Sequence, residues 1–298
     1  MVKVAILGST GMLGSTLTRV LEKDFGEVLE VNRTGKSVTG NSKVLILDVL
    51  KEYNLYEKFM GHEIDYIINA TGMIKQVIDE KKKQDIDSAR AINFDFPQRL
   101  NEYATQTGVR IIQIGTDCVY SGARGFYSEK DKFDPVDVYG KTKLLGEQAS
   151  AESMIIRSSI IGKEINGAVS LLGWLLSQPT GASINGFKNH IWNGVTTLHF
   201  SQIVSGIIKS NSFLKGVQHL APSDVVSKYE LIKILATEFG RSDLEIREHV
   251  AENPINRTLT SLNTQRNLHM WETGGYNKIP TVKELVIEYA KWTNAILK

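Results

Sequence analysis

Short β-branched apolar runs alternate with helical patterns through the first half of the 298-residue chain. The runs are VKVAIL from Val2, VLEVN from Val28, KVLILDV from Lys43, YIINAT from Tyr66 and RIIQIGT from Arg110. Strands that are apolar throughout and separated by helices are typical of a parallel sheet with both faces covered. The sequence therefore predicts an α/β fold with a doubly wound parallel sheet.

The helix before the last of these runs has the clearest pattern. Its expected apolar stripe consists of Ala91, Phe94, Leu100 and Ala104. Gly108 is expected to stop the helix, because glycine readily adopts the left-handed conformation that ends helices. Pro97 lies inside the stripe and is expected to kink it.

Composition excludes several classes of protein. Apolar residues make up 42% and charged residues 23%, with a net charge of +2, so a sizeable core is available but no strongly basic nucleic-acid surface. No apolar run approaches the roughly 20 residues that span a bilayer, and the N-terminus lacks a signal-peptide pattern. The single cysteine, Cys118, cannot form an internal disulfide. We expect a soluble, cytoplasmic protein.

A glycine-rich turn, Gly8-Ser-Thr-Gly-Met-Leu-Gly14, lies between the first strand and the first helix. Glycines let the main chain approach a pyrophosphate, and a helix N-terminus offers free N–H groups with a favourable dipole. The G-x-x-G-x-x-G spacing is a variant of the Rossmann fingerprint. We therefore predict a dinucleotide site on a Rossmann-type sheet.

The ends of the next strands extend this predicted site. Asn32 and Arg33 end the second strand, where an acidic residue would bind ribose hydroxyls and an arginine can accommodate a 2′-phosphate. Arg33 therefore favours NADPH over NADH. Asp48 is expected to reach the adenine. The same crevice is expected to be lined by Ala70, Thr71 and Gly72.

The second half of the chain is less regular. A strand is expected from Met154 to Ile161, and from about Gly167 glycine, asparagine and aromatic residues mix before a last helix from about Thr281. We predict that residues 1–165 form mainly the NAD(P)-binding domain. Residues 166–298 are predicted to form mainly a smaller, interwoven substrate lobe, with some segments returning to the first domain.

Tyr139 and Lys143 stand four residues apart, which places a phenol and an ammonium on one face of a helix. A nearby cation lowers the pKa of a tyrosine and suits it to proton transfer, so Tyr139 is expected to protonate a carbonyl oxygen while nicotinamide delivers hydride. Tyr229 and Lys233 repeat this spacing in an ordinary amphipathic pattern, so spacing alone is weak. Thr116, ending the preceding strand, offers a hydroxyl to the substrate oxygen, although it could also cap a turn.

The central block resembles the extended short-chain dehydrogenase/reductases. The block comprises TDCVYSG from Thr116, FYSE from Phe126, Pro135 and VYGKTKLLGE from Val138. Within that superfamily it looks most like the dTDP-4-dehydrorhamnose reductases, which reduce the 4-keto group of a nucleotide-linked deoxysugar with NADPH or NADH.

The resemblance implies roles for single residues. Tyr139 would be the proton donor and Lys143 its partner, with Thr116 and Asp117 contacting substrate. Asn93 would lie beneath the active site. The turn over the pyrophosphate would consist of Gly8, Thr10, Gly11, Met12 and Leu13, and the nicotinamide side of Ala70 and Thr71.

The chain departs from that family's pattern in its predicted sugar pocket. Ile160 follows Arg157-Ser-Ser, where the family usually has a tryptophan that touches the sugar. The stretch expected to contact substrate includes His190, Trp192 and Asn193, although a structural role is the alternative for His190. Arg257 is a candidate for the diphosphate because its fork matches phosphate geometry, the alternative being a surface arginine.

We therefore predict an NAD(P)H-dependent reductase acting on a nucleotide-sugar substrate. One alternative is an epimerase or dehydratase of the same superfamily, for which Asp117 beside Thr116 supplies an acid. Another is a non-catalytic, NADP-binding regulatory subunit resembling the partner of methionine adenosyltransferase. The histidines show no paired metal spacing, so no catalytic metal is expected. No nucleic-acid or membrane partner is expected, and a homodimer is left open.

Overall fold

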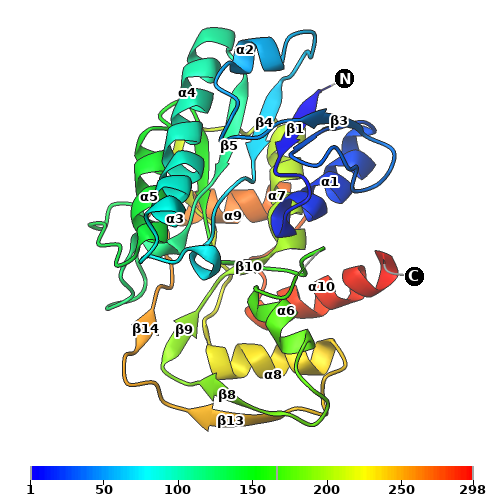
Figure 1. The fold of residues 1–298 in the computed structure, drawn as a ribbon. Helices are drawn as coiled ribbons and strands as arrows, with labels where there is room; N and C mark the ends of the chain where they lie inside the picture. The colour runs from blue at the N-terminus through cyan, green and yellow to red at the C-terminus, as the bar shows by residue number, and fades with distance from the viewer. Residues whose placement is uncertain (1, 166, 297–298) are drawn as a thin grey trace.

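A computed structural model of the chain describes residues 2–165 and 167–296. Its main feature is a seven-stranded sheet in the order β11-β6-β5-β4-β1-β2-β3, in which every neighbouring pair is parallel (Figure 1). The strands are β1 (Val4–Leu7), β2 (Leu29–Asn32), β3 (Lys43–Ile46), β4 (Tyr66–Asn69), β5 (Arg110–Ile114), β6 (Met154–Arg157) and β11 (Gly216–His219). The prediction of a doubly wound parallel sheet is confirmed, and β4 and β2 flank β1 as in dinucleotide-binding folds.

Helices cover both faces of this sheet (Figure 1). One face carries α1 (Met12–Phe25), α7 (Thr197–Lys209) and α9 (Thr264–Thr273); the other carries α2 (Leu55–Lys58), α3 (Lys83–Arg90), α4 (Phe96–Thr107) and α5 (Val138–Gln148). Alternate residues of β1 enter the two cores, with Val4 and Ile6 on the α1 side and Ala5 and Leu7 on the α4 side. This alternation follows from the two-residue period of a strand.

The long helix before β5 is interrupted where the sequence predicted a kink. A π-helical turn, η2 (Ala91–Asp95), joins α3 to α4, and Pro97 lies in the first turn of α4. The extra residue per turn shifts the phase of the helix, so Asn93 and Phe96 are buried while Ala91 and Phe94 are only half-buried. The predicted stripe was therefore wrong in its first half. Gly108 ends the helix in the left-handed conformation, as expected.

The strand expected from Met154 to Ile161 is two strands. β6 stays in the central sheet, whereas β7 (Ile160–Ile161) leaves it and pairs with β10 (Val195–Thr196). β11 returns from the second half of the chain to pair with β6, so the sheet is completed by a late segment.

A smaller lobe lies beyond the carboxyl ends of the sheet strands (Figure 1). Its sheets are formed by β8 (Ser183–Phe187) with β13 (Glu245–His249), and by β12 (Val226–Ser227), β9 (His190–Trp192) and β14 (Ile255–Asn256). Its helices are α6 (Leu171–Leu176), α8 (Lys228–Glu238) and α10 (Val282–Ile296). The boundary between two domains at residue 165 stays a prediction. None of the helices in the described residues is long and apolar enough to cross a membrane.

Candidate functional site

The glycine-rich turn between β1 and α1 is shaped so that a ligand could approach its main chain closely. Gly8 has a φ of +75°, which favours glycine. A Cβ on Gly14 would lie 2.1 Å from the carbonyl oxygen of Gly8, so only glycine fits there. Gly11 is the N-cap of α1 without a side-chain cap, and no acidic residue lies in the first turn of the helix. Thr10, Met12 and Leu13 complete this turn, whose free N–H groups suit a phosphate.

The turn is tied to the end of β2. The amide of Asn32 donates to the hydroxyl of Ser9 (2.9 Å), and its oxygen accepts from the backbone N–H groups of Thr34 and Gly35. The polar atoms of the Asn32 side chain are therefore used in hydrogen bonds that shape the loop after β2. Arg33 follows it and is exposed, so its side chain is the charged group at this end of β2.

Asp48 and the end of β4 lie along the same carboxyl edge. Asp48 is two residues beyond β3, and one carboxylate oxygen accepts from the N–H of Leu50 (3.1 Å). Beyond β4, the main chain of Ala70 passes so close to Gly8 that a Cβ there would be 3.0 Å from the Ala70 oxygen. Thr71 donates its hydroxyl to Asn69, while Gly72 is exposed.

Asn93 connects the loop after β4 to α5. Its side-chain oxygen accepts from the N–H of Met73 (2.9 Å), and its amide donates to the Met73 carbonyl (3.0 Å) and the Thr142 hydroxyl (3.1 Å). Asn93 is 2% exposed, and every polar atom of its side chain is used. This geometry favours a positioning role beneath the site over direct cofactor contact.

Thr116 caps a turn, which is one of the two roles considered for it. It is the N-cap of η3 (Asp117–Val119), and its hydroxyl oxygen accepts from the N–H of Cys118 (3.2 Å). The hydroxyl also lies 3.3 Å from a carboxylate oxygen of Asp117, to which it donates. The cap therefore holds this hydroxyl at the carboxyl end of β5.

Tyr139 and Lys143 lie on α5 next to this strand end. Lys143 is 5% exposed, and its Nζ donates to the carbonyl oxygen of Ile114 at 2.7 Å. Burial lowers the pKa of Lys143, partly offset by the carboxylate of Glu147. Burial also raises the pKa of Tyr139, and Thr116 offsets part of that rise through a side-chain hydrogen bond. The direction for Tyr139 is opposite to the expected one, because burial outweighs any attraction from a nearby ammonium.

A buried ion pair that the sequence analysis missed supports the main chain of Thr116. Arg157 and Glu147 face each other at 2.7 Å with both side chains almost fully buried. The other oxygen of Glu147 accepts from the N–H of Thr116 at 3.2 Å. Gly115 leaves room for the pair, since a Cβ there would be 2.7 Å from Arg157. Glu147 ends the VYGKTKLLGE block one helical turn after Lys143. This spacing places it on the same face of the helix, and it was the sequence signal that could have marked Glu147 as part of the site.

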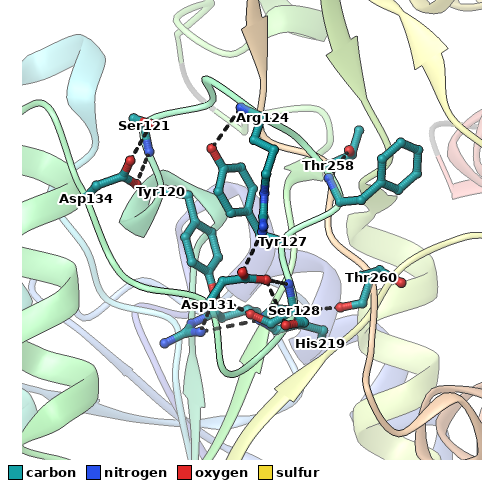
Figure 2. Close-up of polar contacts among 12 residues, drawn as sticks. Tyr120, Ser121, Arg124, Tyr127, Ser128, Asp131, Asp134, His219, Thr258 and Thr260 are labelled. Carbon is teal, nitrogen blue, oxygen red and sulfur yellow. Dashed lines mark hydrogen bonds and ion pairs between the residues drawn. The ribbon is translucent and has the colours of Figure 1, made fainter.

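The loop from Tyr120 to Asp134 follows η3, and Figure 2 shows the polar contacts that hold it. Asp134 accepts from the N–H and hydroxyl of Ser121, and Asp131 accepts from Ser128 and pairs with Arg124 at 2.6 Å. The loop is joined to the late segment near Thr258, which bonds the main chain of Phe126 and Tyr127. A segment far away in the sequence therefore helps to hold this loop in place.

Asp117 faces the smaller lobe. Burial raises the pKa of its carboxyl, while the charges of Arg257 and Lys228 oppose that rise. The charge of Arg257 acts on Asp117, and its Nε donates to the carbonyl of Tyr120 (2.9 Å). Its contact with a diphosphate stays a prediction. Lys228 was not predicted, and no motif marked it.

The other predicted substrate residues are distributed differently. The indole N–H of Trp192 donates to the Ser159 hydroxyl at 2.7 Å, which places this largely buried ring beside the residue preceding Ile160. Ile160 itself pairs with Val195. Asn193 is buried and makes two hydrogen bonds to the main chain of Leu259, which favours a structural role.

His190 and the second Tyr–Lys pair make their contacts away from Thr116, Tyr139 and Lys143. His190 bonds the carbonyl of Asn253 (3.1 Å) and stacks on Phe187. Lys233 lies over the ring of Tyr229 on the exposed side of α8. Over residues 2–165 and 167–296, no group of three or more His, Cys, Asp or Glu could hold a metal ion.

Known proteins share this architecture. A family model described as the RmlD substrate binding domain matches residues 2–291. A dTDP-4-dehydrorhamnose reductase from Aggregatibacter actinomycetemcomitans is 27% identical over 240 residues, covering 77% of this chain and 76% of that protein. The methionine adenosyltransferase 2 subunit beta of Bos taurus is 24% identical over 287 residues, covering 92% and 82%.

A solved structure gives the same picture of the fold. The dTDP-4-dehydrorhamnose reductase of Bacillus anthracis in complex with NADP has a TM-score of 0.77 to this chain at 19% identity. The match covers 98% of this chain and 100% of that one. At this identity the likeness shows a shared fold.

Proposed function

The chain belongs to the RmlD substrate binding domain family of extended short-chain dehydrogenases/reductases, and on that basis we propose that it reduces the 4-keto group of a nucleotide-linked deoxysugar with NADPH. The observation that carries the proposal is the convergence of Thr116, Tyr139 and Lys143 at the carboxyl end of β5. Relatives named as dTDP-4-dehydrorhamnose reductases support the substrate class.

The residues present fit a nicotinamide cofactor. Gly14 and Gly8 leave the main chain open beside the uncapped N-terminus of α1, which suits a pyrophosphate. No carboxylate stands at the end of β2, and the exposed Arg33 suits a 2′-phosphate, which favours NADPH. The bound nicotinamide would supply the hydride. A related structure holds NADP, in agreement with this assignment.

The side chains of this chain handle the proton. Tyr139 gives its phenolic proton to the carbonyl oxygen as hydride reaches the carbonyl carbon, so the ketone becomes an alcohol. Burial raises the pKa of Tyr139 and keeps the phenol protonated, as a donor requires. The Thr116 hydroxyl, which donates to Asp117 in the structure, would turn its proton to the same oxygen, and Lys143 would hold the cofactor ribose. The smaller lobe, which lies beyond the carboxyl ends of the sheet strands, would cover the sugar and its nucleotide.

Replacing Tyr139 tests this mechanism. Tyr139→Phe removes the proton donor with little change in shape, and we expect kcat to fall by about 10²- to 10⁴-fold. The absorbance of NADPH reports turnover of dTDP-4-keto-6-deoxysugars, and titration of NADPH checks that its Kd is unchanged. Tyr229→Phe, in the second Tyr–Lys pair, is the matched control and keeps full activity. Full turnover by Tyr139→Phe would exclude Tyr139 from the mechanism.

Two other functions have a specific observation in their favour. Burial raises the pKa of Asp117 beside Thr116, which suits the acid of a dehydratase or epimerase; such an enzyme turns over the sugar nucleotide with no net oxidation of NADPH. The likeness to methionine adenosyltransferase 2 subunit beta favours a regulatory subunit. That function predicts cofactor binding without ketosugar reduction and co-purification with a partner enzyme.

A further inference from the structure

Lys228 is a charged residue of the smaller lobe whose position no sequence pattern explains. It is the first residue of α8, directly after the N-cap Ser227. Its Nζ lies 5.2 Å from the centroid of the Trp192 ring, in a cation–π contact. Trp192 in turn donates to Ser159, close to the carboxyl end of β6. These contacts direct the ammonium toward the edge where the sheet strands end.

Among residues 2–165 and 167–296, the recorded contact of the Lys228 ammonium is with the Trp192 ring, and no ion pair neutralises it. Within the described residues its Nζ has no hydrogen-bond acceptor and no carboxylate within ion-pair distance. The negative group that acts on it most strongly is the carboxylate of Asp117, the residue that follows Thr116. Arg257 acts on the same carboxylate, so two cations face one anion. The site therefore has an excess of positive charge.

Burial makes this excess costly. It lowers the pKa of Lys228 to about 8, although Asp117 and Cys118 raise it in part. Lys228 is half-buried. An ammonium that has lost part of its hydration and has no acceptor in the protein is stabilised by a ligand that supplies an anionic oxygen. An unpaired cation near the carboxyl ends of the sheet strands is therefore a candidate binding residue.

We propose that Lys228 binds a negatively charged oxygen of the substrate, with Arg257 beside it and Asp117 setting the local charge. The inference rests on the proposed function, since it places this oxygen on the nucleotide sugar. Two parts of such a ligand carry the required chemistry: the diphosphate and a carboxylate on the sugar. An ammonium–oxyanion contact in a partly desolvated site contributes about 1.5–3 kcal/mol, or about 10- to 100-fold in Kd.

Calorimetric titration of the NADP-loaded protein tests the proposal. The ligands are dTDP, thymidine, UDP-glucose and UDP-glucuronic acid, which separate the nucleoside, the diphosphate and the sugar carboxylate. Lys228→Met keeps the aliphatic stem over Trp192 and removes the charge. Lys233→Met is the matched control, because Lys233 lies on the same helix over the Tyr229 ring but is exposed. Lys228→Arg keeps the charge and guards against a folding defect.

We expect Lys228→Met to weaken dTDP binding about 10- to 100-fold, with thymidine and NADP binding unchanged and Lys228→Arg close to the natural protein. Lys228→Met could instead leave the binding of dTDP and UDP-glucose unchanged and weaken only the binding of UDP-glucuronic acid. The sugar carboxylate would then be the group that Lys228 binds. Equal effects of Lys228→Met and Lys233→Met, or no effect on any ligand, would overturn the proposal.

The same titrations separate this inference from the proposed function. A protein that binds dTDP through Lys228 but oxidises no NADPH with any ketosugar would keep the inference and refute the reductase. A protein that reduces ketosugars with the same KM after Lys228→Met would keep the reductase and refute the inference.

Discussion

A single histidine shows how much the surroundings of a side chain decide its charge. The Nε2 of His219 lies 3.3 Å from an Nη of Arg157, and its Nδ1 lies 2.8 Å from the carbonyl of Thr260, a partner visible in Figure 2. A guanidinium has no acceptor, so Nε2 accepts and the proton resides on Nδ1. His219 is therefore neutral, and burial lowers its pKa to about 4 despite the carboxylate of Glu129.

This histidine makes the stability of the protein depend on pH. Between pH 6.5 and about 4 the unfolded chain binds a proton at His219 that the folded chain does not, so the free energy of unfolding falls as pH falls through this window. The loss is at most about 3 kcal/mol. Urea unfolding at pH 7.5 and 5 measures it. His219→Gln should reduce the dependence and leave the part that comes from His199, whose pKa burial also lowers, whereas the exposed-site control His269→Gln should keep all of it.

At the scale of elements, two helices meet without room for a side chain. A Cβ on Gly146 of α5 would lie 2.0 Å from the carbonyl oxygen of Asn93 in the π-helical turn η2. The same turn places the Asn93 side chain on Met73 and Thr142. The close approach therefore links the helix that carries Tyr139 to the loop after β4.

Gly146→Ala should reverse the usual effect of this substitution. Within an exposed helix interior, alanine stabilises by about 1 kcal/mol relative to glycine. Here the added methyl group meets backbone, so we expect a loss of about 1–3 kcal/mol in the free energy of unfolding. Chemical denaturation measures the change, with Gln148→Ala, an exposed position on α5, as the control. A stabilised Gly146→Ala protein would contradict the close approach.

The elements themselves were largely predictable, but their phase was not. The strands β1 to β5 followed from runs of β-branched apolar residues, although Glu30 and Gln113 are buried polar residues within them and the edge strand β3 is partly exposed. The predicted apolar stripe of the long helix was wrong at Ala91 and Phe94. A π-helical turn adds one residue to the turn, and a pattern of 3.6 residues per turn does not contain it. β7 was merged with β6, because both are apolar and the pairing with β10 depends on a distant segment.

At the scale of the whole molecule, the candidate site is assembled from segments far apart in the chain. The turn at Gly8 and the Tyr139–Lys143 pair carry local motifs, so they could be predicted. Lys228 could not, because its approach to Asp117 arises only when the smaller lobe packs against the sheet. A lysine at the start of an amphipathic helix looks like a solvated residue in the sequence alone.

The two halves of the chain also share one core. α7 packs on α1, and its residues Phe200, Ile203, Val204 and Ile207 are buried with Leu17. A fragment of residues 1–165 would lose α7, α9 and β11 and expose this apolar face. We expect the fragment to show no cooperative urea transition and to elute as aggregates in size-exclusion chromatography. The full chain should unfold in one transition. A monomeric fragment that binds NADP would contradict this expectation.

The position of β11 beside β6 has a consequence for synthesis of the protein. Until residues 216–219 leave the ribosome, β6 remains an outer strand with a row of unpaired N–H and C=O groups. Other chains can pair with such an edge, so nascent copies on one messenger are at risk of joining each other. Translation speed between β6 and β11, and chaperones that cover the edge meanwhile, therefore influence the yield of folded protein.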